Sequence, residues 1–191
     1  MARKKAGKKG AGAQPDMPQE FLDDIIHNGV QAHRAGKLSE AEALYRQVLD
    51  IQPDHGEANH LLGLIAFQIG RNDQAIQLIK KAIRTNPDKA AFHANLGPAL
   101  QKKGRLDDAV ASCVRAIELE PDYAEAHANL GSAFHARGNL DEAVASYRRA
   151  IAIDPDFAEA HNNLGNTLKD LGRFEEALVC YRHALNINPG D

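Results

Sequence analysis

The sequence has few of the residues that stabilise small secreted domains or span membranes. Its 191 residues include no Trp, two Met and two Cys, and aromatic residues make up 5%. Cys113 and Cys180 are too few for a disulfide framework and lie far apart in the pattern described below, so we expect both to be reduced. No apolar run approaches the about 20 residues of a membrane-spanning helix, and no apolar segment follows the amino-terminal cations as in a secretory signal. We therefore expect a cytoplasmic protein.

Motifs that carry chemistry are also missing. The nine His residues include no pair four residues apart and no HExxH motif, so no zinc site is recognisable. Gly7, Gly10 and Gly12 do not form a phosphate loop, because no strand precedes them and no Gly-Lys-Ser/Thr follows. No Ser-His-Asp arrangement or pair of catalytic carboxylates is visible. We predict no cofactor, no metal site and no enzymatic activity in this segment, although a catalytic domain could follow in a longer protein.

What the sequence has instead is a period of 34 residues. Four positions of this period, counted from Ala124 as position 1, are each filled five times by one residue type. They hold Gly29, Gly63, Gly97, Gly131 and Gly165 (position 8), Gly36, Gly70, Gly104, Gly138 and Gly172 (position 15), Ala41, Ala75, Ala109, Ala143 and Ala177 (position 20), and Pro53, Pro87, Pro121, Pro155 and Pro189 (position 32). Such repetition predicts an array in which each unit packs on its neighbours rather than around one large core.

Each unit is predicted to form two helices joined by a tight turn. In the unit 124–157, apolar residues recur at helical spacing over 130–134 and again over 143–151. Gly138 between them is expected to end the first helix in a left-handed conformation, and Pro155 to stop the second. Three pairs have the spacing of a capping box at the start of a first helix: Asp54 with Glu57, Asp122 with Glu125, and Asp156 with Glu159.

These positions resemble the tetratricopeptide repeat family. Its signature is matched by Leu130, Gly131, Phe134, Ala143, Tyr147, Ala150 and Pro155. The resemblance implies an all-α fold, a right-handed α-solenoid of five helix-turn-helix repeats. Within the array 19–191 the repeats would span 22–55, 56–89, 90–123, 124–157 and 158–191. Position 4, usually Trp or another bulky residue in the family, is His93, His127 and His161 here, and we interpret these as packing residues.

The later repeats, with the segments AHANLG and AHNNLG, are most similar to the superhelical arrays of protein O-GlcNAc transferase-type proteins. In those arrays Asn at position 6 lines the concave face and holds an extended peptide by its backbone, and the resemblance carries this role onto Asn95, Asn129 and Asn163. A primary amide suits the role because it both donates and accepts a hydrogen bond. Polar neighbours expected on the same face are Asn162, Asn166, Ser132 and Gln101. The alternative is that these Asn side chains are solvated or bond within the helix.

The amino-terminal half of the same face is expected to be apolar. The predicted patch consists of Ile26, Val30, Leu61, Leu64 and Phe67. It suits an amphipathic helix, or it is covered by the chain's own leader. Pro98 lies inside the first helix of the third repeat, where we expect a kink between the two halves.

Charge narrows the choice of partner. Family members that clamp a free C-terminal carboxylate use Lys and Arg on this face, whereas this chain has Glu57, Glu125 and Glu159 at position 2. A free-carboxylate ligand is therefore disfavoured, and a peptide partner with basic or neutral side chains is favoured.

Residues 1–18 form a basic tail with the cations Arg3, Lys4, Lys5, Lys8 and Lys9. The tail has almost nothing to bury, so we expect it to be disordered. Such an arm can bind nucleic acid, an acidic protein surface or anionic lipid through charge alone. Because no aromatic residues are interleaved with the cations, a solubilising leader is the preferred interpretation.

The last repeat is expected to leave Leu178, Tyr181 and Leu185 partly exposed, because no solvating helix follows it. More of a longer protein would cover them, or they would meet a second copy in a homo-oligomer. The predicted function is a scaffold or adaptor that binds peptide segments in the concave groove. Two alternatives stay open: the substrate-recruiting amino-terminal region of a larger, protein O-glycosyltransferase-like enzyme, and self-assembly through uncapped repeat ends.

Overall fold

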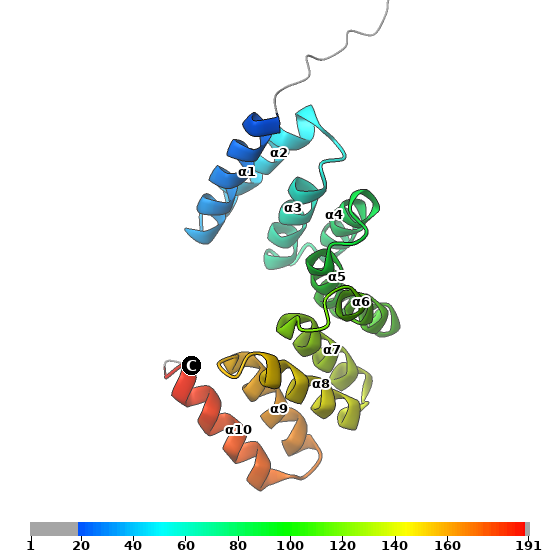
Figure 1. Cartoon of the computed structure of the whole chain (residues 1–191), viewed down its shortest axis with the longest axis vertical. Coiled ribbons are helices and arrows are strands. Elements are labelled where there is room, and N and C mark those ends of the chain that lie inside the picture. The colour runs from blue at the N-terminus through cyan, green and yellow to red at the C-terminus, as the bar shows by residue number, and fades with distance from the viewer. Residues whose placement is uncertain (1–18, 190–191) are drawn as a thin grey trace, which may run out of the picture.

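A computed structural model describes residues 19–189, which form five antiparallel pairs of α-helices with no strand between those limits (Figure 1). The helices are α1 (Gln19–Arg34), α2 (Leu38–Ile51), α3 (Gly56–Gln68), α4 (Asn72–Thr85), α5 (Ala90–Lys102), α6 (Leu106–Leu119), α7 (Ala124–Arg137), α8 (Leu140–Ile153), α9 (Ala158–Asp170) and α10 (Phe174–Ile187). The predicted all-α array of five helix-turn-helix repeats is confirmed. The tail expected at 1–18 lies outside the described residues.

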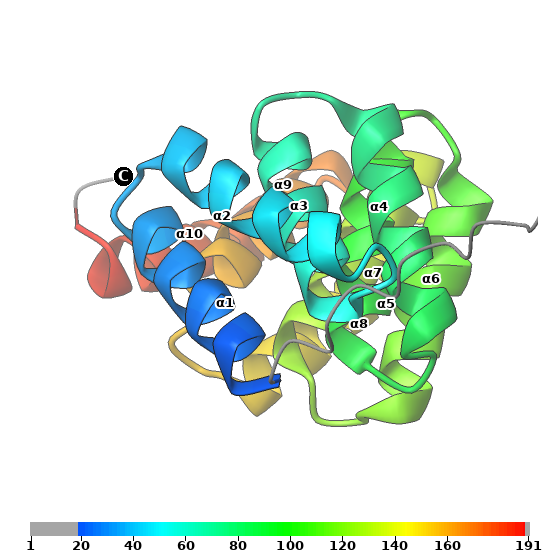
Figure 2. The same cartoon turned by 90° about the horizontal axis from the view of Figure 1, so that it is seen from above.

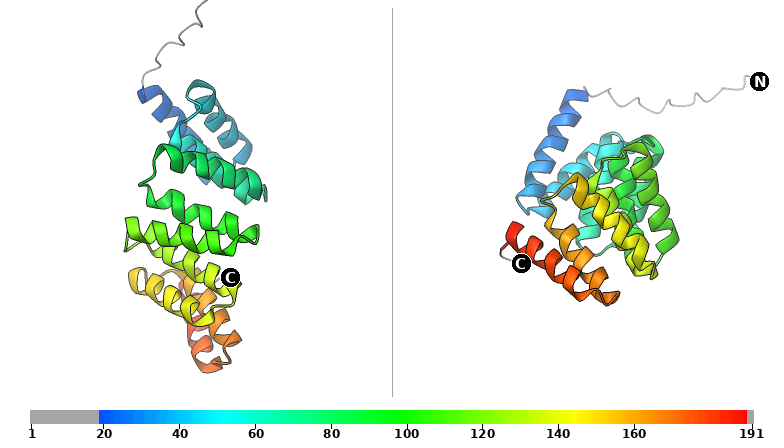
Figure 3. Two further views of the ribbon diagram at one scale, coloured as in Figure 1. Left: turned by 90° about the vertical axis from the view of Figure 1, so that its right-hand side faces the viewer. Right: turned by 60° about the horizontal axis from the view of Figure 1, so that its bottom comes forward.

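The pairs are stacked one on the next. Each second helix packs on its own first helix and on the first helix of the following pair. Figure 1 shows the pairs along an arc with α1 at one end and α10 at the other, and Figure 2 shows the helices arranged around a common axis. Figure 3 shows the layers from the side. Between residues 19 and 189, no helix is both long and apolar enough to cross a membrane.

The turn inside each pair depends on glycine, as predicted. Gly138 has φ 85° and ends α7, with its N–H donating to the carbonyl of His135 at 3.0 Å. Nothing lies within 4 Å of where a Cβ on Gly138 would stand. Glycine is therefore needed here for its positive φ and not for space.

Glycine is needed for the opposite reason in the middle of the first helices. A Cβ on Gly131 would lie 2.8 Å from the ring of Tyr147, which is only 2% exposed. The same core cluster contains Ala143 and Ala150, with Phe134 packed against it. The predicted close crossing of α7 and α8 is confirmed, because small residues on both helices leave room for the tyrosine ring.

The predicted capping boxes are wrong. Helix α7 begins at Ala124, so Asp122 lies one residue before the N-cap, Tyr123, whose side chain makes no capping hydrogen bond. The Asp122 carboxylate instead accepts a hydrogen bond from Nη2 of Arg149 on α8 at 2.7 Å. The equivalent carboxylates pair in the same way, Asp54 with Lys81 and Asp88 with Arg115. Each of these pairs joins a second helix to the linker before its own repeat, although such exposed pairs add little stability.

The histidines at position 4 do more than pack. Nε2 of His127 lies 2.9 Å from the carbonyl oxygen of Pro121, the closing proline of the preceding repeat, and His93 and His161 make the equivalent bonds. Asn59 occupies this position in the second repeat and donates through Nδ2 to the carbonyl of Pro53 at 3.1 Å. Because a carbonyl only accepts, the His rings must carry a proton on Nε2. In the second to fifth repeats, the residue at position 4 thus provides a side-chain N–H that links neighbouring repeats.

Both cysteines are free thiols, as expected. Cys113 is fully buried beneath Gly97, and burial raises its pKa to about 12. Such a thiol stays protonated at neutral pH and acts as a small core residue.

Candidate functional site

A groove of about 630 Å³ runs across the first helices of four successive repeats, α3, α5, α7 and α9. It is lined by Phe67, Pro98, Gln101, Lys102, Ala128, Asn129, Ser132, Ala136, Glu159 and Asn163. Five of these are predicted site residues: Phe67, Gln101, Asn129, Ser132 and Asn163. Lys102 and Ala136 were missed, although both lie on the same helical face at position 13, where a full count of the face would have found them.

The groove combines an apolar surface with amide side chains and two charged side chains, those of Lys102 and Glu159. Phe67, Pro98, Ala128 and Ala136 supply the apolar part. This mixture is typical of sites that bind a peptide, where apolar area supplies affinity and a few polar groups fix the orientation.

Of the three Asn side chains at position 6, that of Asn163 is the most available to a ligand. It is half-buried in the groove, and within residues 19–189 its side chain has no hydrogen-bond partner. Only its backbone carbonyl is engaged, accepting from the hydroxyl of Thr167 at 2.8 Å. One donor group and one acceptor are therefore free to meet a ligand.

Asn129 is partly used by the protein itself. Its Nδ2 donates to the carbonyl of Ala94 at 3.3 Å. That carbonyl lies four residues before Pro98, and it lacks the usual helical donor because proline has no N–H. The amide of Asn129 substitutes for the missing donor, and α5 runs through Pro98 without interruption. The kink expected at Pro98 stays a prediction.

This substitution makes a testable prediction. Asn129→Ala is expected to lower the free energy of unfolding by about 1–2 kcal/mol, because it leaves a buried carbonyl unsatisfied. In a Pro98→Ala background the new N–H bonds that carbonyl, so the same change should cost much less. A double-mutant cycle in urea measures the coupling.

Asn163→Ala is the matched control for this cycle. The carbonyl equivalent to that of Ala94 is the one of Ala128, and Ser132, four residues later, has an ordinary backbone N–H for it. Losing the Asn163 amide should therefore hardly change stability. Equal costs of Asn129→Ala in the two backgrounds would contradict the assignment.

The Nδ2 of Asn95 is engaged outside the groove. Its Nδ2 lies 3.1 Å from Nε2 of His60, a residue only 7% exposed whose ring contacts Phe92 at a centroid distance of 4.4 Å. Burial lowers the pKa of His60 to about 4, so the ring is neutral at pH 7 and Nε2 can accept from the amide. The three Asn residues predicted to act alike therefore differ. Asn95 bonds to His60 and does not line the groove, Asn129 lines it but donates to Ala94, and the Asn163 side chain is available.

The remaining predicted polar residues divide in the same way. Gln101 and Ser132 are bonded to each other across α5 and α7: Nε2 of Gln101 donates to the Ser132 carbonyl and the Ser132 hydroxyl donates to Oε1 of Gln101. Oδ1 of Asn166 accepts from the Tyr181 hydroxyl at 2.9 Å. Asn162 is exposed and lies in a second groove.

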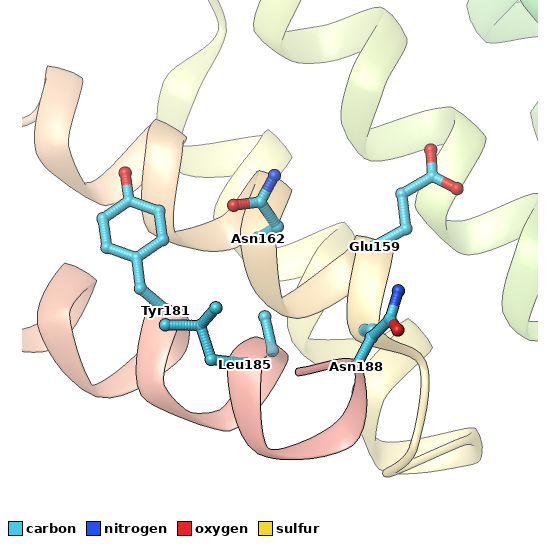
Figure 4. A pocket seen from close by; sticks show the side chains of 7 residues that line it. Glu159, Asn162, Tyr181, Leu185 and Asn188 are labelled. Carbon is cyan, nitrogen blue, oxygen red and sulfur yellow. The ribbon is translucent and has the colours of Figure 1, made fainter. Parts of the chain in front are cut away.

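That second groove, about 550 Å³, lies between α9 and α10 (Figure 4). It is lined by Ala158, Glu159, Asn162, Tyr181, Ala184, Leu185 and Asn188. Glu159 borders both grooves. The two predicted amides at 162 and 163 thus belong to different surfaces.

The predicted apolar patch does not lie in one groove. Phe67 reaches the main groove, whereas Ile26 and Leu61 pack against the core around Tyr45. Val30 and Leu64 are half-buried. Neighbouring helices cover much of each of these side chains.

The three Glu residues at position 2 are unpaired. Glu57, Glu125 and Glu159 are exposed and form no ion pair within the described part of the chain, and the same holds for Lys102 at the groove. The carboxylate of Glu159 at the groove is therefore free to interact with a cation in a ligand. Metal binding is a separate question: between residues 19 and 189, no group of three or more His, Cys, Asp and Glu side chains could hold a metal ion.

Comparisons with known proteins point to one family. Models of the tetratricopeptide repeat match residues 32–97 and 158–191, and a further TPR repeat model matches 99–138 and 131–172. No curated protein sequence matches the chain.

Solved structures give the same result. TTC0263, a thermophilic TPR protein of Thermus thermophilus, is 26% identical with a TM-score of 0.78, covering 89% of this chain and 93% of its own. MamA is 28% identical with a TM-score of 0.69, covering 84% of this chain and 94% of its own. YrrB, described as a TPR protein with an unusual peptide-binding site, is 25% identical with a TM-score of 0.65, covering 91% of this chain and 89% of its own.

Proposed function

Because the chain belongs to the tetratricopeptide repeat family, we propose that it is a protein–protein interaction scaffold whose main groove binds an extended segment of a partner. The observation that carries this proposal is the free amide of Asn163 in a groove lined by four successive first helices. The description of YrrB, a structure similar over most of this chain, supports a peptide as the ligand class.

The groove would hold the peptide mainly by its backbone. The Asn163 amide can donate to a peptide carbonyl and accept from a peptide N–H, and Oδ1 of Asn129 adds a second acceptor. Phe67 and Pro98 offer apolar contacts for side chains of the peptide. Backbone-directed contacts fix the direction of an extended segment while leaving most of its side chains unspecified.

Charge then selects among such segments. Glu159 is exposed and unpaired at the α9 end of the groove, so a Lys or Arg in the peptide gains an ion pair there. We propose that the preferred ligand is an internal segment with a basic residue rather than a free carboxyl terminus.

Selection from a peptide-display library on the purified full chain tests this proposal. Enriched sequences are expected to carry Lys or Arg at a fixed position. Fluorescence anisotropy with the best peptide should show about tenfold weaker binding for Asn163→Ala, the loss of about one hydrogen bond.

Asn186→Ala, at an exposed position on α10, serves as the matched control and should bind like the wild type. If Asn163→Ala and Glu159→Gln both leave the affinity unchanged, the groove is not the binding site.

A second candidate is that the array recruits substrates for a larger, protein O-glycosyltransferase-like enzyme. It is favoured by Asn129 and Asn163, which occupy the same position of successive repeats and line one groove. The reading frame beyond Asp191 in the source genome decides between the two candidates. A nucleotide-sugar-binding domain encoded there would support a substrate-recruiting region of an enzyme, and its absence would support the scaffold.

A further inference from the structure

The outer face of α10 is an unpartnered apolar stripe. Phe174, Leu178 and Leu185 are 58%, 54% and 51% exposed, and Tyr181 between them is half-buried. Spacings of four, three and four residues place the four side chains on one side of the helix (Figure 4 shows Tyr181 and Leu185). In the described chain α10 packs mainly on α9, and its Glu176 forms an ion pair with Arg148 of α8 at 3.1 Å. The expected partial exposure of Leu178, Tyr181 and Leu185 is confirmed, although the Tyr181 ring lies against Gly165 of α9 and its hydroxyl donates to Asn166.

In the preceding repeat the same surface is covered. Tyr147 and Ile151 of α8 occupy the positions of Tyr181 and Leu185, and they pack in a core cluster with Ala160 and Leu164 of α9. The stripe on α10 therefore has the shape and chemistry of a helix-binding surface that recurs between the repeats.

The opposite end of the array cannot fill this surface. If a second copy docked head to tail, its α1 would have to supply the residues that α9 supplies to α8. At the positions of Ala160 and Leu164, α1 carries the exposed residues Asp24 and Asn28. Burying an unpaired carboxylate and an amide against Leu178 would cost free energy, so an open chain of copies is disfavoured.

The stripe is complementary to itself. When two α10 helices cross antiparallel about a two-fold axis, Phe174 of one faces Leu185 of the other, and Leu178 faces Tyr181. Glu175 and Arg182 flank the stripe at equivalent heptad positions, and each would meet the other across the axis. Both are exposed and form no ion pair within residues 19–189.

We propose that two copies of this chain form a closed, two-fold dimer through α10, with the stripes buried and two Glu175–Arg182 pairs fixing the antiparallel orientation. This inference goes beyond the proposed peptide binding, because the main groove lies on other helices and stays open. Two grooves in one particle would bind a partner with two target segments more tightly than one groove does.

Sedimentation velocity of the full chain over a dilution series from about 1 to 200 μM tests the dimer, a range suited to small interfaces. The wild type is expected to change from the 20.8 kDa monomer to a species of twice that mass and to grow no further. Leu178→Asp with Leu185→Asp should stay monomeric throughout. Val114→Asp, at an exposed apolar position on the second helix α6, should dimerise like the wild type. Circular dichroism checks that each variant is helical.

A charge exchange tests the orientation. Glu175→Lys alone should weaken dimerisation about tenfold, because it places a positive charge against Arg182 of the second copy. Adding Arg182→Glu to the same chain should restore the dimer. A monomer at every concentration, a dimer unaffected by the two Asp substitutions, or a mass that keeps rising would overturn the proposal. Peptide binding is measured separately on the monomeric variant. If that variant still binds the selected peptide, the groove is intact whether or not the dimer forms.

Discussion

Replacing Gly131 with Val is expected to lower the free energy of unfolding by about 2–3 kcal/mol. A Cβ at this position would stand 2.8 Å from Cε1 of Tyr147, and two further ring atoms lie within 2.9 Å. The ring is 2% exposed and has no space into which to move. The added methyl groups would force α7 and α8 apart, which outweighs the small gain in helix propensity over glycine.

Urea unfolding followed by circular dichroism measures this loss. Ala136→Val introduces a similar side chain at an exposed position of the same helix, and it should change stability by no more than about 0.5 kcal/mol. A Gly131→Val protein as stable as this control would show that the two helices do not depend on a glycine for their close crossing.

Lowering the pH from 6.5 to 4 is expected to cost about 3 kcal/mol of folding stability through His60 alone. Burial lowers the pKa of this side chain from 6.5 to about 4. Between these values the unfolded chain binds a proton that the folded chain does not, so acid favours unfolding. The contribution is fully present above pH 6.5 and is lost as the pH falls through the folded-state pKa.

His60→Gln isolates this effect, because the Gln carbonyl can still accept from Asn95 but does not titrate. The variant should be less stable than the wild type at pH 7.5, where packing against Phe92 is altered, yet its stability should fall less steeply below pH 6.5. Parallel curves of unfolding free energy against pH for the two proteins would contradict the assignment.

The sequence pattern predicted the framework because each framework position has one local cause. A positive φ requires glycine at 138, and a ring from the next helix requires glycine at 131. Both causes recur once per repeat, so they appear as a period.

The helix starts were misjudged for a related reason. The Asp-x-x-Glu spacing of Asp122 and Glu125 is correct for a capping box, but the first helical residue is one position later than the box needs. The linker places Asp122 beside Arg149, and this partner comes from 27 residues further along the chain. A contact between successive units is invisible to a rule that considers four adjacent residues.

The candidate site was harder to predict than the fold. Asn95, Asn129 and Asn163 occupy one position of the repeat, and no neighbouring residue in the chain signals that their amides differ. The differences arise from His60 and Pro98, which belong to neighbouring helices. Whether a groove amide is free therefore depends on irregularities in the repeat, which the repeat pattern itself does not describe.

The central claim is that the groove across α3, α5, α7 and α9 is the peptide site, and chemical-shift mapping tests it most directly. Adding the selected peptide to ¹⁵N-labelled protein should shift the side-chain amide of Asn163 and the backbone amides around Asn129 and Ser132. Resonances of the second helices α4, α6 and α8 should stay in place. Shifts confined to those helices or to the outer face of α10, with Asn163 unmoved, would contradict the account.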